Sequence, residues 1–261
     1  MPFLAFAKVN IFLKIVGTRG NYHELLSRFM VVKNLYDTLS FDAKRTNEPF
    51  ELIGDFNCDV THNTLYKIYT ELKKAGFDKE VDAVMKERAL RVEKKIPTGA
   101  GLGGGSSDAA TFLKMLNETA QLGLSVEELM RIGARVGADV AFFVSGYESA
   151  NVSGVGEVVE LFDEPALDLQ IMTPFIHCDT AEVYRCFRAS FLASIEPEIA
   201  KTMWIRSSRE LMDHYDAVTL NDLFRASLQL YPALGDHAKE GWFFSGSGSS
   251  FFKVKEKGKR F

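Results

Sequence analysis

A glycine-rich stretch at residues 97–107 has the composition of an anion-binding loop. Five of the seven residues at 99–105 are glycine, and glycine allows positive φ and close approach of another molecule to the backbone. Ser106, Ser107 and Asp108 follow, each able to cap a helix, and apolar residues at helical spacing come next. A glycine loop that leads into a helix presents unpaired amides and the positive end of the helix dipole. We therefore predict a phosphate site, with a flexible turn as the alternative.

Two charged residues far from this loop also stand in unusual positions. Lys8 and Asn10 are neighbours on the second face of an alternating segment at 6–16, although asparagine is depleted in strands. Asp139 stands at the head of an apolar run that ends at Val144. An unpaired buried charge is costly, so Asp139 must reach water or meet a cation. The plainer alternatives are a solvated face of an edge strand for the first pair and a helix cap for Asp139.

A second loop of small residues lies near the C-terminus. Serine and glycine alternate at 245–250, between the aromatic segments 242–244 and 251–252. Two strands joined by this loop are the expected local structure. The loop is either a plain hairpin connection or part of a site.

The common nucleotide motifs do not account for the glycine loop. Residues 99–104 match G-x-G-x-x-G, but the helix after them leads to another helix and no acidic residue ends a second strand, as the dinucleotide fold requires. No lysine follows the glycines, which excludes a P-loop. The H-R-D and D-F-G motifs of protein kinases are absent from the sequence. The lysine and the carboxylate must therefore come from other segments.

The elements that would position these residues follow from periodicity and capping signals. Strands are expected at 6–16, 29–32, 37–42 and 89–96, which favours an antiparallel or mixed sheet over a run of βαβ units. A helix is expected from Asn63 to Gly76, a second after the glycine loop, and a third from the capping box at Ser125 to Gly137. A composition change near 150–165 suggests domains at 1–155 and 156–261. The second begins with a strand at 169–174, then a helix capped by Asp179 and helices near 208–215 and 221–230.

Composition limits the class of protein. The chain has 261 residues, 46% of them hydrophobic, and a net charge of −4, which disfavours a nucleic-acid binder despite the basic segment 253–260. Three cysteines without C-x-x-C spacing indicate neither a disulfide framework nor a zinc site. No secretory signal and no uncharged run of about 18 residues are present. These features predict a cytoplasmic protein that does not bind a membrane.

Lys8, the glycine loop and the final loop together resemble the GHMP kinase superfamily, whose three motifs occur in this order. The first motif is similar to 7–11, the second to 97–110 and the third to 245–250. Within the superfamily, the segments 7–13, 22–25 (Tyr-His-Glu-Leu), 101–110 and 137–140 (Gly-Ala-Asp-Val) resemble members that phosphorylate a cytidine-diphosphate-linked methylerythritol. The resemblance extends from Lys8 to about Val254. It departs from the usual pattern at 19–21 and at Ala141, where many members have proline.

The resemblance implies an α+β, two-domain GHMP kinase fold. Its N-terminal ATP-binding domain would be a ribosomal-protein-S5-domain-2-like α/β domain, and its C-terminal domain a ferredoxin-like α+β domain. The implied reaction transfers the γ-phosphate of ATP, with Mg²⁺, to the 2-hydroxyl of the cytidylyl substrate, a step of the non-mevalonate route to isoprenoid precursors. A monomer or weak homodimer is expected.

The resemblance also implies roles for individual residues. Lys8 and Asp139 match the catalytic pair, with Asp139 orienting the hydroxyl and accepting its proton late. The residues that match the cytidylyl-substrate site are Asn10, Tyr22, His23, His177 and Ser247. Ser106 or Ser107 would contact Mg²⁺ directly or through water. The matched ATP loop consists of Pro97, Thr98, Gly99, Ala100, Gly101, Leu102, Gly103, Gly104, Gly105, Ser106 and Ser107.

Three other functions remain open from the sequence. Another GHMP kinase would act on mevalonate, homoserine or a sugar. A non-catalytic ligand sensor could share the fold, although the presence of both Lys8 and Asp139 argues against it. A nucleic-acid binder is disfavoured by the acidic charge balance.

Overall fold

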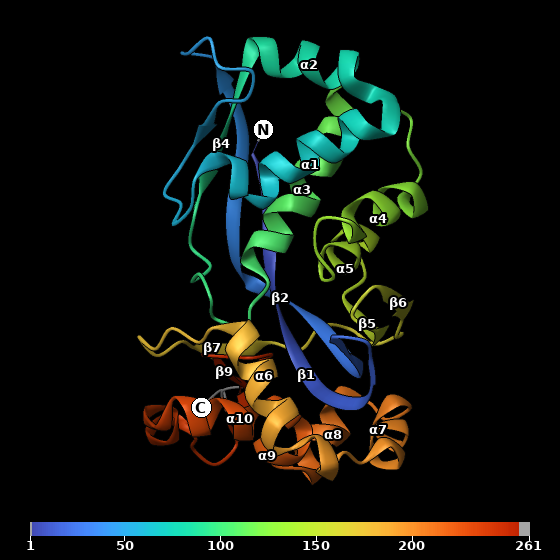
Figure 1. Ribbon diagram of the computed structural model, residues 1–261, viewed down its shortest axis with the longest axis vertical. Coiled ribbons are helices and arrows are strands. Elements are labelled where there is room, and N and C mark those ends of the chain that lie inside the picture. The colour runs from blue at the N-terminus through green and yellow to red at the C-terminus, as the bar shows by residue number, and fades with distance from the viewer. Residues whose placement is uncertain (1, 256–261) are drawn as a thin grey trace, which may run out of the picture. The chain divides into compact units, whose positions relative to one another are not determined.

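The computed structural model describes residues 2–255, so most of the basic segment 253–260 lies outside the described residues (Figure 1). The chain forms two compact units from interleaved segments. The first unit comprises Met1–Ala7, Leu35–Ile96 and Gly103–Tyr147. The second comprises Lys8–Asn34, Pro97–Leu102 and Glu148–Phe261. Strands β1 (Phe3–Arg19) and β2 (Tyr22–Ala43) contribute to both units. The boundary at 155/156 assumes contiguous halves and stays a prediction.

The first unit packs helices on one side of a mixed sheet. The C-terminal part of β2 pairs antiparallel with β4 (Arg88–Glu93), and β4 pairs parallel with β3 (Leu52–Ile53). Figure 1 shows the helices on one side of β2 and β4. They are α1 (Thr64–Leu72), α2 (Asp78–Glu87), α3 (Gly104–Thr119), α4 (Val126–Ala134) and α5 (Val140–Ser145). The expected mixed sheet is therefore confirmed here.

The core of this unit explains why α3 is so firmly placed. Phe112, Leu113 and Leu116 of α3 are fully buried against Leu65 and Ile68 of α1 and apolar residues of the sheet. Burying one such side chain contributes about 1.5–3 kcal/mol relative to exposure. The helix that follows the glycine loop is therefore anchored along one whole face.

The second unit contains two sheets and a group of helices. The N-terminal part of β2 pairs antiparallel with β5 (Ser149–Gly154), and β5 pairs with β6 (Val158–Leu161). A separate sheet has the order β7 (Leu169–Met172), β9 (Phe251–Val254), β8 (Phe243–Phe244). The helices are α6 (Thr180–Ser190), α7 (Pro197–Trp204), α8 (Ser208–His214), α9 (Ala217–Leu220) and α10 (Asp222–Leu230). The aromatic strands predicted around the final loop are β8 and β9.

Several local predictions are confirmed and others are wrong. Asn63 and Ser125 cap α1 and α4 with their side chains, as expected. The helix predicted from Asn63 to Gly76 also ends as expected, because Gly76 adopts a φ of 97° that breaks the helical backbone before α2. The two strands predicted at 29–32 and 37–42 are one continuous strand, β2. Within residues 2–255, no helix is long and apolar enough to cross a membrane.

Candidate active site

Lys8 and Asn10 are both buried on β1, in the second unit. Lys8 is 4% exposed and Asn10 2%, so the solvated-face interpretation of this strand is wrong. Lys8 Nζ donates to Asn10 Oδ1 at 2.6 Å and lies 4.6 Å from the centroid of the Phe29 ring. Asn10 Nδ2 donates to Ser27 Oγ at 2.9 Å. Asn10 therefore fixes the direction of the lysine side chain, because its amide is itself held by β2.

The first half of the glycine loop is bonded to this strand and to the final loop. The amide of Lys8 donates to Leu102 O at 2.9 Å, Ser245 Oγ donates to Gly101 O at 2.9 Å, and the amide of Ser250 donates to Ala100 O at 3.1 Å. The tertiary structure thus brings Lys8, residues 100–102 of the glycine loop and the final loop together within the second unit. The bonds engage successive carbonyls, whereas anions bind to backbone N–H groups. Residues 100–102 are therefore held in place through their carbonyl groups, which an anion would not bind.

Gly101 is at a position where only glycine fits. Its φ is +73°, and a Cβ there would lie 2.2 Å from Ser245 O and 3.1 Å from Gly248 O. A left-handed conformation costs an L-residue about 1–2 kcal/mol, and the contact with backbone adds to that cost. The backbone of the final loop therefore packs directly against Gly101 of the glycine loop. The final loop is more than a plain hairpin connection.

We expect Gly101→Ala to lower the free energy of unfolding and to weaken ATP binding. Gly241→Ala is the matched control, since Gly241 has a φ of +72° and nothing within 4 Å of its Cβ position. In the control, the free energy of unfolding should fall only by the conformational cost of about 1–2 kcal/mol. In Gly101→Ala it should fall further, because the new Cβ also collides with the backbone of the final loop. Urea unfolding of both variants measures the difference. An equal fall in the free energy of unfolding would contradict the close packing of the final loop on Gly101.

The second half of the loop begins α3 in the first unit. Gly103 is the N-cap, with φ 71° and no side-chain cap, and its carbonyl accepts from the amide of Ser107 at 2.8 Å. The prediction that Ser106, Ser107 or Asp108 caps the helix is wrong, because the glycine turn starts the helix earlier. The amides of the first turn have no intrahelical acceptor. The hydroxyls of Ser106 and Ser107 lie within this same turn.

Asp139 is the N-cap residue of α5 but does not cap it with its side chain. Its backbone is helical, with φ −71° and ψ −14°, and no side-chain bond to the helix amides is formed. The capping alternative for Asp139 is therefore wrong. A Cβ on the neighbouring Gly137 would lie 3.7 Å from Ser106 Oγ, so this turn packs beside the start of α3. Lys8 belongs to the other unit, and its pairing with Asp139 stays a prediction.

A buried charged cluster at the base of the loop was missed by sequence reasoning. Lys94 Nζ donates to Asp108 Oδ2 at 2.6 Å and to Asp37 Oδ2. Asp37 is fully buried, and its other oxygen accepts from the amides of Lys95 and Ile96. Burial raises the pKa of Asp108 to about 7, against the opposing effect of the Lys94 ammonium. The sequence signals that could have indicated this cluster are Lys94 just before the glycine loop and Asp108 just after it.

The residues matched to the cytosine site begin β2 in the second unit. Tyr22 is 69% exposed, whereas His23 is 8% exposed and packs against Tyr184 and Phe187, with ring centroids 5.2 and 5.9 Å away. Within residues 2–255, His23 Nε2 is buried without a hydrogen-bond partner. Burial lowers the pKa of His23, and the nearby Arg188 lowers it further. A neutral imidazole with one unused nitrogen can bond to a heterocycle.

His177 and Ser247 lie against the loops of this unit. The His177 ring packs on Gly99, where a Cβ would be 2.8 Å from Cε1 and Nδ1. Ser247 is 7% exposed and its hydroxyl pairs with Thr180 Oγ1 at 2.8 Å. His177, which matches the cytidylyl-substrate site, therefore packs directly against Gly99 near the start of the ATP loop.

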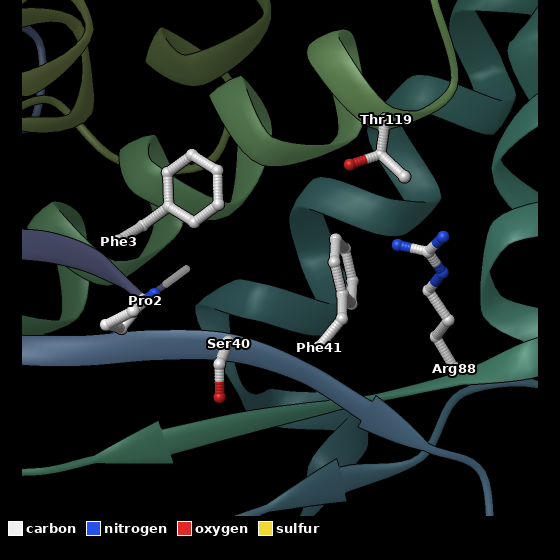
Figure 2. Close-up of a pocket in the computed structure, with 6 residues that line it drawn as sticks. All are labelled: Pro2, Phe3, Ser40, Phe41, Arg88 and Thr119. Atoms are coloured by element: carbon white, nitrogen blue, oxygen red, sulfur yellow. The ribbon is translucent and has the colours of Figure 1, made fainter.

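A separate pocket in the first unit contains none of the predicted site residues. It has a volume of about 360 Å³ and is lined by Pro2, Phe3, Ser40, Phe41, Arg88 and Thr119. Figure 2 shows Arg88 beside the ring of Phe41, and its guanidinium carbon is 5.5 Å from the ring centroid. None of the three sequence motifs contributes a residue to this pocket, so the loops and β1 remain the candidate active site.

Comparison with known proteins shows which family the chain resembles. Residues 63–147 match the GHMP kinases N terminal domain. A 4-diphosphocytidyl-2-C-methyl-D-erythritol kinase of Sulfurimonas denitrificans is 53% identical over 97% of this chain and 96% of its own. One from Helicobacter pylori is 41% identical over 97% and 94%. A crystal structure of 4-(cytidine 5'-diphospho)-2C-methyl-D-erythritol kinase is 29% identical, with a TM-score of 0.73 over 98% of this chain and 90% of that one.

The full-length match includes both units as well as the glycine loop, and the predicted GHMP kinase fold is confirmed. With a relative 53% identical over nearly the whole of both chains, this chain belongs to the 4-diphosphocytidyl-2-C-methyl-D-erythritol kinase family of the GHMP kinases.

Proposed function

We propose that the protein transfers the γ-phosphate of ATP to the 2-hydroxyl of 4-diphosphocytidyl-2-C-methyl-D-erythritol, in the non-mevalonate route to isoprenoid precursors. Family membership supports the substrate class. The observation that carries the chemistry is the bonding of the glycine loop to both Lys8 and the final loop. A buried lysine at the edge of an anion-binding loop suits a reaction in which negative charge develops on transferring phosphate.

Positioning and charge stabilisation do most of the work in this reaction. Lys8, aimed by Asn10, is the cation for the transferring phosphoryl group. Asp139 is proposed to orient the acceptor hydroxyl and to accept its proton late, because a largely dissociative transition state leaves the proton in place until then.

The glycine loop and the first turn of α3 are proposed to hold the ATP phosphates through backbone N–H groups. Mg²⁺ supplies neutralisation of the phosphate charge when it is bound with ATP. The hydroxyls of Ser106 and Ser107 fit this ion, which accepts a few oxygen donors and keeps phosphate oxygens and water. They would contact it directly or through water.

Tyr22, His23 and His177 are proposed to hold the cytosine ring, with Asn10 and Ser247 lining the site. The unused Nε2 of His23 is the group that a base edge would satisfy. Leaving such a group unpaired is costly, so hydrogen bonding discriminates between bases more sharply than apolar contact does. Cytidine should therefore be preferred to uridine.

His23→Ala is expected to raise KM for the cytidylyl substrate about tenfold, the equivalent of one lost hydrogen bond of about 1.4 kcal/mol, while KM for ATP stays unchanged. His214→Ala is the control, because His214 is exposed and its ring bonds to Glu210 O within its own helix. Steady-state kinetics with each substrate varied in turn measure the effect. An equal rise in both KM values would contradict the assignment.

The deciding experiment measures ADP release by the purified protein with four alcohols: the cytidylyl substrate, mevalonate, homoserine and galactose. We expect turnover with the first alone. Turnover of homoserine or mevalonate instead would contradict the proposed substrate but still support a GHMP kinase activity. Absence of transfer to every alcohol, with ATP still bound, would favour a ligand sensor.

We further propose a cytoplasmic location and a monomer or weak homodimer. Cys58, Cys178 and Cys186 form no disulfide, which is consistent with a reducing compartment. Size-exclusion chromatography with light scattering at several concentrations tests the oligomeric state.

A further inference from the structure

The two ends of the glycine loop approach each other at its base, in the first unit. β4 ends at Glu93 and α3 begins at Gly104. A Cβ on Gly104 would lie 2.9 Å from Ile96 Cγ2 and 3.5 Å from Lys94 Nζ. The last residues before the loop therefore touch the first residue of the helix that follows it.

Lys94 connects the same two ends through charge. Its ammonium bonds to Asp37 on β2 and to Asp108 in the second turn of α3. Asp37 also accepts from the backbone amides of Lys95 and Ile96. One lysine thus joins the strand before the loop, the neighbouring strand and the helix after it.

Asp108 depends on Lys94 for its pairing. It is 2% exposed, and within residues 2–255 its Oδ1 has no hydrogen-bond partner. Lys94 is the one cation bonded to its other oxygen among these residues. Removal of the lysine would leave a buried carboxylate unpaired, which is strongly unfavourable. The start of α3 would have to shift to relieve it.

We propose that Lys94 is a positioning residue for the nucleotide: its ammonium sets the direction of the amides at Gly104, Gly105 and Ser106 by tying Asp108 to Asp37. The proposal rests on the proposed function, since it assigns those amides to ATP phosphate. Lys94 acts through α3 and does not itself contact the reacting atoms. Its loss should therefore affect ATP binding and leave the cytidylyl substrate unaffected.

The test compares Lys94→Met with the matched control Lys44→Met. Lys44 is a partly buried lysine of the same unit whose Nζ donates to Met85 O at 2.7 Å, away from the loop. We expect Lys94→Met to raise the Kd for MgATP, measured by calorimetry, about tenfold, since displacements near 1 Å cost up to about a hundredfold. KM for ATP should rise in parallel, with KM for the cytidylyl substrate unchanged. Lys44→Met should change neither, and Lys94→Arg should restore most of the affinity.

Hydrogen exchange provides a readout that does not depend on catalysis. Amides at 104–108 should exchange faster in Lys94→Met than in wild type, and at the wild-type rate in Lys44→Met. Wild-type ATP affinity in Lys94→Met would overturn the proposal. If that variant does not fold, Asp108→Asn decides, because it keeps the shape of the residue and the pair of Lys94 with Asp37; unchanged ATP affinity there overturns the proposal as well.

The outcomes separate this proposal from the proposed function. Wild-type protein that binds ATP but phosphorylates no cytidylyl substrate overturns the function and leaves the role of Lys94 supported if the affinity changes appear. Wild-type protein that binds no ATP overturns both.

Discussion

Asp139→Asn is expected to lower kcat at least a hundredfold while the Kd for ATP stays nearly unchanged. The substitution keeps the shape of the side chain but removes the carboxylate that orients the hydroxyl and takes up its proton. General acid–base steps contribute about 10²–10⁴-fold. Because the Asp139 side chain makes no capping bond to α5, the substitution should leave the helix intact. Single-turnover kinetics and ATP titration measure the two quantities.

Asp216→Asn is the control for this experiment. Asp216 caps α9, and its side chain accepts from the amide of Thr219 at 2.7 Å. Asparagine caps a helix about as well as aspartate, so kcat and stability should change little. A fall of less than about tenfold in kcat for Asp139→Asn would show that Asp139 does not act on the proton, given the usual size of such steps.

Lys8→Met is expected to lower kcat about 10²–10³-fold, the usual effect of removing one group that stabilises transition-state charge. The methylene stem is retained in a fully packed position, so the fold should persist. The cost to stability comes from Asn10 Oδ1, which loses the donor that the structure gives it at 2.6 Å. Turnover at saturating ATP, together with thermal unfolding, separates the chemical effect from the structural one.

Lys14→Met gives the opposite pattern and serves as the comparison. Lys14 is on the same strand, 3% exposed, and is paired with the partly buried Asp222. Breaking a buried ion pair costs about 3–5 kcal/mol, so the unfolding midpoint should fall. The turnover per folded molecule should remain near wild type. If both lysine variants lost turnover equally, the effect of Lys8→Met would reflect packing of β1 and not charge near phosphate.

The sequence predicted the site mainly through local signals. Glycine density at 99–105, the alternation around Lys8 and the small-residue loop at 245–250 each depend on residue types a few positions apart. Capping by Asn63 and the capping box at Ser125 were predictable for the same reason, since a cap is bonded to residues two or three positions away. Periodicity also located most strands and helices.

Predictions that required knowledge of surroundings were the ones that were wrong. The face of β1 with Lys8 and Asn10 was open to two interpretations, because a polar strand face is polar whether water or protein covers it. The start of α3 was misplaced because serine and aspartate are good caps in isolation, whereas here the turn at Gly103 begins the helix and Asp108 pairs with Lys94.

The sequence by itself determined that this protein has a glycine loop followed by a helix, with no lysine of its own and with its charged partners elsewhere in the chain. Only the tertiary structure decided how the loop is held: by the amide of Lys8, by Ser245 and Ser250, and by a wall at Gly101 that admits no side chain. The same is true of Lys94, whose partners come from β2 and α3. The physical reason is that loop conformation depends on contacts between residues distant in sequence, and residue order does not encode these contacts locally.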